Sequence, residues 1–399
     1  MKCKITSENS TPFMTFGKMP LANGFLNKSE FDSEFFYEME VGFSSKVSLF
    51  QLNDFPNPEK IFNKKYPFYT GSSQYMINHF KDYAKWLKKD FLSNNSKLIE
   101  IGSNDGTFLK NFSNTNINYI GIEPSESVAK QAIKNGIKTL NIFFNKENIE
   151  SLKEFKNNTD VICAANVICH VPDLNNLISS VDDLLSSKGV FVFEEPYLGS
   201  MFSKISYDQI YDEHIFMFSL TSVKKIFDLF NLELIDAIPQ ITHGGSMRYV
   251  ISRKGKHQIN SRVHKGLDLE KKQKLDDLES CIKFKKDCES SKANTSTALK
   301  KLKENGKKIC GYAATSKSTT ILNYCNINQN IIDFICDTTT DKIGKFSPGM
   351  HIPIVEVSHF HKNLPNIAYL FAWNHKEEIF AKEKEFLNKN GEWFSHVSL

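Results

Sequence analysis

The spacing of apolar residues changes along the chain and divides it into stretches of different character. Residues 1 to about 70 carry short apolar runs, such as residues 46–52, among many Phe, Pro, Asn and Ser residues. This pattern predicts a small, irregular, β-containing lobe. From Gly71 the apolar positions recur at helical spacing through Leu87, which predicts a helix at the start of a second domain.

Strand-like and helix-like patterns then alternate up to about residue 255. The expected strands are 97–101, 118–123, 161–164 and 190–194, and the expected helices are 106–112, 127–135 and 174–185. Such a βαβ series predicts a doubly wound, mostly parallel sheet over residues 71–255.

A charged stretch over 256–305 has no strand pattern and predicts exposed helices that connect two domains. A new strand-turn-helix pattern begins at 308–312, followed by apolar runs at 331–336, 353–355 and 368–372. Residues 306–399 are therefore expected to form a second, smaller α/β domain with a Rossmann-like sheet.

Composition changes this picture little but excludes some classes of function. The 399 residues are 40% hydrophobic and 24% charged, and the net charge of +4 comes from interspersed lysines and acids. We therefore expect a soluble protein without a nucleic-acid surface or a membrane span. Eight cysteines form no C-x-x-C pair and mostly lie in apolar runs, which favours buried free thiols in a reducing cytoplasm.

A glycine loop follows the first strand of the central domain. The stretch 98–106 (LIEIGSNDG) resembles motif I of class I S-adenosylmethionine methyltransferases, and Gly102 and Gly106 allow the backbone to approach a ligand closely. About 20 residues later a second strand ends in Glu123, a spacing that suits a carboxylate bound to ribose hydroxyls. The alternative is an ordinary strand-turn-helix with a chance acid. The expected cofactor residues are Glu100, Gly102, Ser103, Asp105, Gly106, Glu123, Pro124 and Asn166.

A cluster of proton-handling side chains lies downstream, at 207–214 (YDQIYDEH). A histidine titrates near neutral pH, so His214 can accept and return a proton, while Tyr207 and Tyr211 are expected on one face. His170 arrives from the sheet edge, and His243 and Gly244 follow in an HGGS turn. Each histidine can instead be structural, and the HGGS turn can serve the fold alone.

The residues named so far resemble those of the nucleotide-sugar C-methyltransferases, three-domain enzymes that add a methyl branch to a deoxysugar. The resemblance extends over almost the whole chain. It includes the stretches 20–23 (PLAN), 66–73 (YPFYTGSS), 166–173, 207–214, 243–248, 311–317 (GYAATSK), 348–354 and 372–374.

The resemblance implies S-adenosylmethionine as cofactor and a nucleotide-diphosphate-linked 4-keto sugar as substrate. It implies that His214 removes the proton next to the ketone to form an enolate, supported by Tyr211, Glu213 and His170, with Tyr69 or Tyr66 closing over the sugar. The substrate-binding residues that it implies are Tyr66, Ser73, Tyr207, His243, Gly244, Tyr312, Lys317, Asn323, Asp337 and His351.

Two departures from the family stand out. The N-terminal lobe of the family usually holds a zinc ion on four cysteines, whereas only Cys3 remains here, so the lobe is expected to fold without metal. The second departure is Asp212, beside the expected base, where the family tends to have histidine.

Two other functions stay open at this point: methylation of an oxygen or nitrogen acceptor, and non-catalytic binding of a sugar nucleotide. The sequence also leaves open the sugar, its nucleotide, the ring carbon, its stereochemistry, and whether the protein is a monomer or a homodimer.

Overall fold

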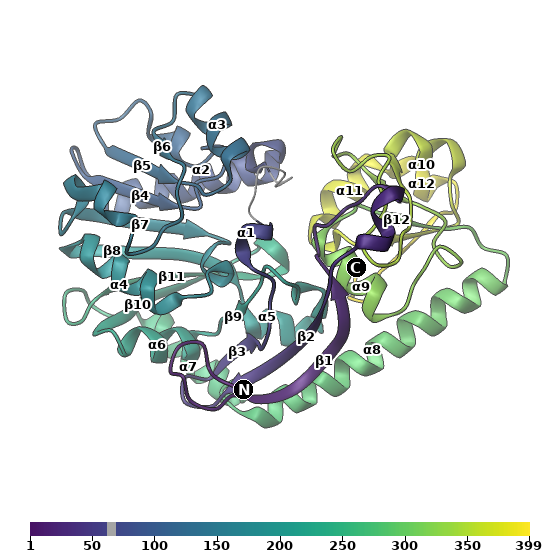
Figure 1. Cartoon of the computed structure of the whole chain (residues 1–399), viewed down its shortest axis with the longest axis horizontal. Coiled ribbons are helices and arrows are strands. Elements are labelled where there is room, and N and C mark those ends of the chain that lie inside the picture. The colour runs from purple at the N-terminus through teal and green to yellow at the C-terminus, as the bar shows by residue number, and fades with distance from the viewer. Residues whose placement is uncertain (62–68) are drawn as a thin grey trace.

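The computed structural model describes residues 1–61 and 69–399. Two α/β parts lie at either end of the molecule, and the N-terminal strands and one long helix run between them (Figure 1).

The N-terminal lobe is a regular antiparallel sheet. Its strands are β1 (Thr11–Pro20), β2 (Phe36–Ser44) and β3 (Leu49–Leu52), with the short helices η1 (Lys28–Ser33) and α1 (Pro58–Ile61). The fourth strand, β9 (Phe216–Met217), comes from the central domain and pairs with β3. The expectation of an irregular lobe confined to 1–70 was therefore wrong, because a strand distant in sequence completes its sheet.

The central domain is built on a seven-stranded sheet in the order β10-β11-β8-β7-β4-β5-β6. Its strands are parallel except β11, which is antiparallel to both of its neighbours. The bounds are β4 (Lys97–Ile101), β5 (Asn118–Ile122), β6 (Thr139–Leu140), β7 (Thr159–Ala165), β8 (Leu185–Pro196), β10 (Leu232–Gln240) and β11 (Ser246–Arg253).

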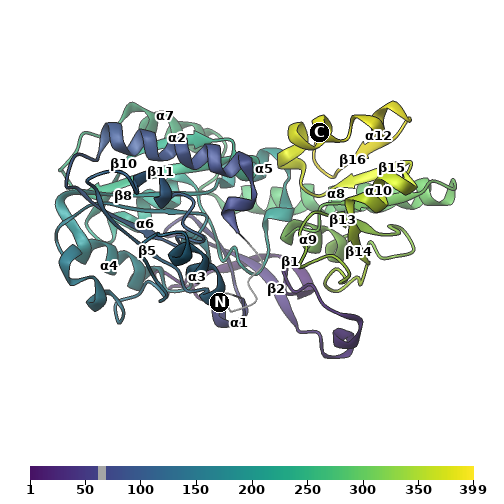
Figure 2. The same cartoon turned by 90° about the horizontal axis from the view of Figure 1, so that it is seen from above.

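Helices cover both faces of this sheet. Alternate strand residues face opposite sides, so Leu98 joins a core with Tyr83 and Leu87 of α2, whereas Ile99 joins a core with Leu177 of α4. Figure 2 shows α2 running along one face. The elements are α2 (Gln74–Asp90), α3 (Glu126–Lys134), α4 (Leu174–Leu184), α5 (Leu198–Lys204), α6 (Leu220–Asp228), η2 (Thr70–Ser72), η3 (Leu109–Phe112), η4 (Ile149–Phe155), η5 (Ile168–His170), η6 (Tyr207–Gln209) and η7 (Thr242–Gly244).

The C-terminal domain contains a five-stranded parallel sheet in the order β14-β13-β12-β15-β16. Its elements are β12 (Ile309–Tyr312), α9 (Ser316–Tyr324), β13 (Ile335–Asp337), β14 (Ile354–Glu356), α10 (Val357–Asn363), β15 (Ile367–Leu370), η8 (Trp373–His375), α11 (Lys376–Lys382), α12 (Lys384–Asn388) and β16 (Glu392–Phe394). The expected α/β class is confirmed for both domains.

The connecting helices are α7 (Ser261–Lys272) and the 27-residue α8 (Leu278–Glu304), which extends beneath both α/β parts (Figure 1). Helix α8 is less exposed than its charge suggests. Cys281, Phe284 and Leu299 are buried, and the Phe284 ring stacks on Phe202 at 4.3 Å between centroids.

Two further local expectations were wrong. The helix expected over 106–112 is only the short η3, because Gly106 has a φ of +80° and Asp105 Oδ1 accepts from the amide of Thr107 to form a turn. The strand expected over 331–336 shortens to β13, since Ile331 and Ile332 bond back to Asn328 in a turn.

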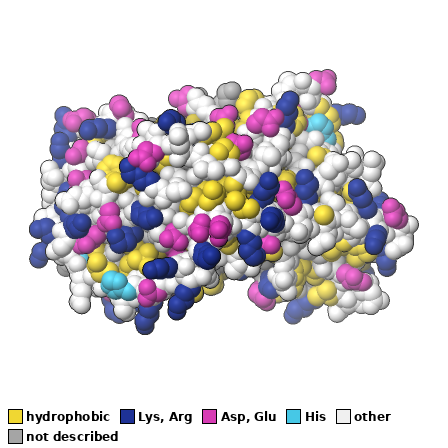
Figure 3. Space-filling model, turned by 90° about the horizontal axis from the view of Figure 1, so that it is seen from below, with side chains coloured by type: hydrophobic (Ala, Val, Ile, Leu, Met, Phe, Trp, Pro, Cys, Tyr) yellow, Lys and Arg dark blue, Asp and Glu magenta, His cyan; other side chains and the backbone are white. Residues whose placement is uncertain are grey.

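The distribution of charge on the surface agrees with the interspersed lysines and acids of the sequence. Lysine, arginine and acidic side chains are intermixed on the face drawn in Figure 3. All eight cysteines are free and buried, as expected. No helix in the described part of the chain is long and apolar enough to cross a membrane.

Glu270 of α7 fastens the linker to the central domain. This buried carboxylate accepts from the amides of Leu220 (2.7 Å) and Thr221 (2.8 Å) at the start of α6 and from the Tyr197 hydroxyl (2.8 Å). Charge-assisted bonds to helix amides are stronger than neutral ones and also favour the helix dipole.

We expect Glu270→Ala to lower the free energy of unfolding by about 3 kcal/mol, because it leaves several buried donors unpaired. Thermal unfolding followed by circular dichroism measures the effect. The exposed Glu289→Ala is the matched control, and equal midpoints for the two variants would contradict the role of Glu270.

Candidate active site

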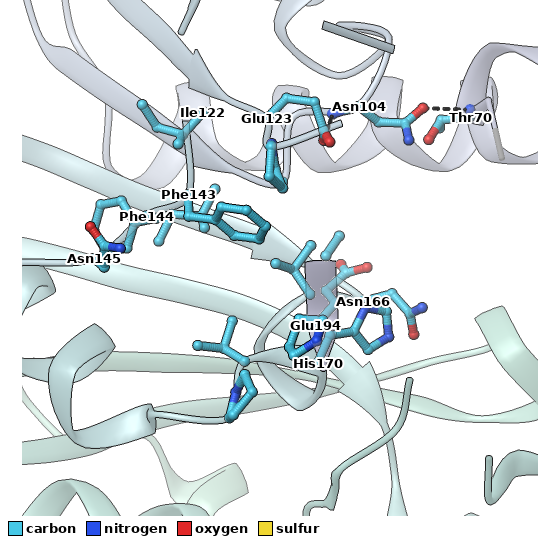
Figure 4. A pocket seen from close by; sticks show the side chains of 18 of the residues that line it. Thr70, Asn104, Ile122, Glu123, Phe143, Phe144, Asn145, Asn166, His170 and Glu194 are labelled. Carbon is cyan, nitrogen blue, oxygen red and sulfur yellow. Dashed lines mark hydrogen bonds between the residues drawn. The ribbon is translucent and has the colours of Figure 1, made fainter. Parts of the chain in front are cut away.

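A cavity of about 560 Å³ opens at the carboxyl ends of the central parallel strands, the usual place for a ligand in such sheets. Of the predicted site residues, Gly102, Glu123, Pro124, Asn166, His170 and His243 line it. Figure 4 shows Glu123 on one side and Asn166, His170 and Glu194 together on the other.

The glycine loop needs its two glycines for steric reasons. Gly102 and Gly106 have φ values of +68° and +80°, which L-residues rarely adopt. A Cβ on Gly102 would collide with Val167, and one on Gly106 would lie 2.7 Å from Ile137. The loop can therefore pass close to the cavity only with glycine at these places.

Glu123 is prepared to accept further hydrogen bonds. Its carboxylate accepts from the amides of Asn104 (3.0 Å) and Ser125 (2.8 Å), and burial raises its pKa. Each oxygen keeps a lone pair, so both hydroxyls of a ribose could donate to it. Glu123 follows β5 as the sequence predicts.

The other predicted cofactor residues support the loop without lining the cavity. Asp105 accepts from the amide of Gly71 (2.8 Å), and the Ser103 side chain lies against Gly121. Glu100 is buried, and burial followed by the charges of Asp105 and Glu123 raises its pKa.

His214 has one defined tautomer in the hydrogen-bond pattern. Its Nδ1 lies 2.7 Å from the Gln209 carbonyl, which can only accept, so Nδ1 carries the proton. Its Nε2 lies 2.8 Å from the Tyr211 hydroxyl and therefore accepts from it. Burial, followed by His170, holds the pKa of His214 well below its usual range, so the side chain is a neutral imidazole.

His170 lines the cavity, and its ring stacks on that of His214 at 5.3 Å between centroids. Burial lowers the pKa of His170 to about 3. The structure thus brings together three of the predicted catalytic residues, namely Tyr211, His214 and His170.

Glu213 meets the N-terminal lobe. Asn23 Nδ2 donates to Glu213 Oε1 at 2.5 Å, and the Ala22 amide donates to Asp212 Oδ1 at 3.1 Å. Both carboxyls are buried. The lobe therefore contacts the segment that carries His214 directly.

A group of basic side chains lies where the central and C-terminal domains meet. Burial, followed by Lys317, lowers the pKa of His243 to about 3, and burial lowers that of Lys317 to about 8. The Lys317 and Lys204 ammonium groups lie 4.8 and 5.8 Å from the centre of the Trp373 ring. Gly244 has no room for a Cβ beside that ring.

Several predicted substrate residues have structural partners. The Tyr207 hydroxyl bonds Cys325 Sγ at 3.4 Å in the core, and Tyr312 donates to Glu383 at 2.7 Å. Tyr207 and Tyr211 do not share a face, because η6 ends at Gln209; that expectation was wrong. The partners of the remaining four are the Met76 amide for Ser73, the Thr319 and Pro348 carbonyls for Asn323, the Ala314 amide for Asp337, and Glu34 for His351.

Tyr69 is half-buried and precedes η2, and Tyr66 lies outside the described residues. The roles predicted for these residues and for the structurally partnered ones stay predictions.

Sequence reasoning missed Glu194, a buried carboxylate that lines the cavity. His79 Nε2 lies 2.6 Å from its Oε2, and Arg248 Nε donates to its Oε1 at 2.5 Å. The Arg248 guanidinium lies 3.9 Å from the centre of the Tyr83 ring. An acid near the end of the strand β8 could have indicated a site residue, but its partners His79 and Arg248 lie in α2 and β11, far from it in the sequence.

Three family models match successive parts of the chain. One described as a methyltransferase domain matches residues 75–237, and one described as a C-methyltransferase C-terminal domain matches residues 241–397. The protein is therefore an S-adenosylmethionine-dependent methyltransferase whose C-terminal part is similar to the C-terminal domain of C-methyltransferases. The third model, described as a putative zinc binding domain, matches residues 3–62.

Among relatives, this methyltransferase is 26% identical to the C-methyltransferase NovU of Streptomyces niveus, over 95% of this chain and 90% of that protein. It is 28% identical to a carboxy-S-adenosyl-L-methionine synthase of Nautilia profundicola, over 39% of this chain and 64% of that protein. A solved structure of the PH0226 protein from Pyrococcus horikoshii covers 50% of this chain and 100% of its own, at 15% identity and a TM-score of 0.38.

The lobe of this methyltransferase does not carry the ligands of a closed zinc site. Residues 3–62 contain one cysteine, Cys3, and no histidine, whereas such a site needs four sulfur or imidazole ligands. Cys3 is packed in the hydrophobic core. Within the described residues, ligand atoms of Cys169, His170 and His214 lie close together, but both ring nitrogens of His214 are already hydrogen-bonded, to Gln209 and Tyr211, so this group is not a metal site.

We expect purified enzyme to contain well under one zinc ion per chain, because the lobe lacks the ligands. Inductively coupled plasma mass spectrometry after dialysis against a chelator measures this. About one tightly held zinc per chain, together with unfolding of the lobe on its removal, would contradict the expectation.

Glu123→Gln is expected to weaken S-adenosylmethionine binding about tenfold to a hundredfold, because a charge-assisted bond to each ribose hydroxyl is weakened. Isothermal titration calorimetry measures the dissociation constant. The exposed Glu150→Gln is the control. Unchanged affinity in Glu123→Gln would remove Glu123 from the cofactor site.

Proposed function

We propose that the enzyme adds a methyl branch to a ring carbon beside the ketone of a nucleotide-linked 4-keto-deoxysugar, through an enolate formed by His214. The observation that carries this proposal is the Gln209–His214–Tyr211 chain of hydrogen bonds, in which His214 stacks on His170 of the cavity wall. Transfer to carbon first requires a base to remove a C–H proton. An oxygen or nitrogen acceptor already has a lone pair, so methylation there depends less on a base.

The hydrogen-bond chain supports a specific division of roles. His214 carries its proton on Nδ1, and its single Nε2 lone pair accepts from Tyr211. When the Tyr211 hydroxyl turns to donate to the ketone oxygen, this lone pair can take the proton from carbon. A hydrogen-bond donor beside the developing negative charge stabilises it.

The neutral state of the base also fits this role. Burial, followed by His170, holds the pKa of His214 well below its usual range, so Nε2 is unprotonated at neutral pH. His170, whose pKa is lowered to about 3, adds an uncharged ring beside the cavity. S-adenosylmethionine, when bound, supplies a methyl group on a positively charged sulfur, and Glu123 and the Gly102 loop would hold it.

The basic group at the domain seam supports a nucleotide diphosphate as the carrier. Lys317 Nζ donates to Asn374 Oδ1 at 3.1 Å, and the charge of Asp208 offsets part of the lowering of the Lys317 pKa by burial. Lys204 reinforces the positive charge, which lowers the pKa of Lys317 further after burial. Two phosphate groups would compensate this charge. The relative NovU is named a C-methyltransferase, which fits the carbon acceptor.

The experiment incubates the enzyme with S-adenosylmethionine and dTDP- or GDP-linked 4-keto-6-deoxyhexose in deuterated water. We expect a methylated product and exchange of the proton next to the ketone. His214→Asn should reduce kcat by about 10²–10⁴-fold with cofactor affinity retained.

The control variant is His264→Asn, on an exposed part of α7. A loss of less than tenfold in His214→Asn with methyl on oxygen or nitrogen would support heteroatom transfer instead. Absence of both exchange and methylation with every keto sugar would contradict the proposed substrate class.

A further inference from the structure

Two neighbouring carboxyls in the catalytic segment are both buried, with Asp212 2% and Glu213 4% exposed. Two neighbouring residues of the lobe hold them: the Ala22 amide donates to Asp212 Oδ1 and Asn23 Nδ2 donates to Glu213 Oε1. In turn, Thr319 Oγ1 of α9 donates to the Ala22 carbonyl at 2.8 Å. The turn at Ala22–Asn23 therefore joins the lobe, the catalytic segment and the C-terminal domain.

The second oxygen of Asp212 is buried and has no hydrogen-bond partner in the part of the chain that the structure describes, and the same holds for the Tyr37 hydroxyl. The two groups are close enough that Asp212 adds to the effect of burial in raising the pKa of Tyr37. Burial and then the charge of Glu213 raise the pKa of Asp212 more than the backbone amides of Ala22, Asp212 and Glu213 lower it. A buried carboxylate anion without full hydrogen bonding costs several kcal/mol. A proton on Oδ2 removes that cost.

The charged groups around Asp212 also favour its protonated, neutral form. Glu213 lies on the same segment, Tyr37 comes from β2, and Asp54 follows β3 and also acts on Tyr37. Lys342, a cation near Glu213, donates to the Ala314 carbonyl at 2.8 Å, and Asp337 and then Glu213 counteract the lowering of its pKa by burial. Burial, followed by the charge of Glu213, raises the pKa of Asp212 to about 8.

We propose that Asp212 is a positioning residue held as a neutral carboxylic acid, and that this form keeps the Ala22–Asn23 turn closed on Glu213 beside His214. Ionisation places a second negative charge next to Glu213 in a buried site. The two like charges then repel each other, and the hold of the lobe on the catalytic segment weakens. Enzyme activity consequently falls at alkaline pH, where Asp212 ionises in the folded protein, and the contribution of Asp212 to folded stability has been lost by then.

The direction in which pH changes the folding stability follows from the pKa of Asp212 in the unfolded and folded chains. Its ordinary pKa in an unfolded chain is about 3.9, and its folded pKa is about 8. The contribution to stability is full below the unfolded value and is lost as pH rises through the folded value, because only the unfolded state gains from releasing the proton. Asparagine stays neutral and keeps an oxygen for the Ala22 amide.

We expect Asp212→Asn to raise the thermal midpoint relative to the natural protein by about 5 °C at pH 8.5 and by much less at pH 5. Differential scanning fluorimetry of the whole chain measures both. Asp212→Ala, which removes the acceptor, should lower the midpoint at both pH values. The surface variant Asp228→Asn should leave the difference between the two pH values unchanged.

The same variants distinguish positioning from mere packing through the pH profile of kcat. In Asp212→Asn the alkaline decline of kcat should move to higher pH, whereas a packing role alone would leave its position unchanged. The kcat measurement rests on the proposed function, whereas the unfolding measurement needs no substrate. Failure of the proposed function can therefore be distinguished from failure of the proposal for Asp212. An equal midpoint difference at pH 5 and pH 8.5 would overturn the neutral state of Asp212.

Discussion

The segment from Tyr207 to His214 has almost no regular structure of its own, so its shape depends on contacts with all three parts of the molecule. Trp373 Nε1 of the C-terminal domain donates to Asp208 at 2.7 Å, and Thr320 Oγ1 donates to the Ile210 carbonyl at 3.0 Å. The lobe holds Asp212 and Glu213 through Ala22 and Asn23. The positions of the catalytic side chains therefore depend on how the three parts pack around this segment.

The residues immediately after His214 also depend on contacts with the N-terminal lobe. The Leu52 amide donates to the Ile215 carbonyl at 2.8 Å, and β9 then pairs with β3 as the last strand of the lobe sheet. Backbone pairing fixes the position of a residue more tightly than side-chain packing alone, because each hydrogen bond has a narrow geometry. A lobe that resembles a separate domain in the sequence thus acts as a support for the catalytic residues.

Buried charge is distributed unevenly over the site. Glu194 is paired with Arg248 and His79, which hold its pKa low despite burial, and Asp208 is paired with His396 and Trp373. His170, His214 and His243 are instead buried as neutral rings with lowered pKa values. Hydrogen bonds and nearby positive charge keep the carboxylates of Glu194 and Asp208 ionised, and burial keeps the three imidazoles neutral. The site therefore has fixed charges around an uncharged base.

Local sequence determined the α/β class, the glycine loop and the position of Glu123, because strand-helix alternation and a positive φ depend on residues close together in the chain. It also placed His214 beside Tyr211, which are three residues apart. The order of the lobe sheet, the contact of Asn23 with Glu213, the pairing of Glu194 with Arg248 and the structural roles of Tyr207 and Tyr312 depended on the tertiary structure. Each of these joins residues that are distant in sequence, and only the packing of the three parts decides which partner a buried polar group finds.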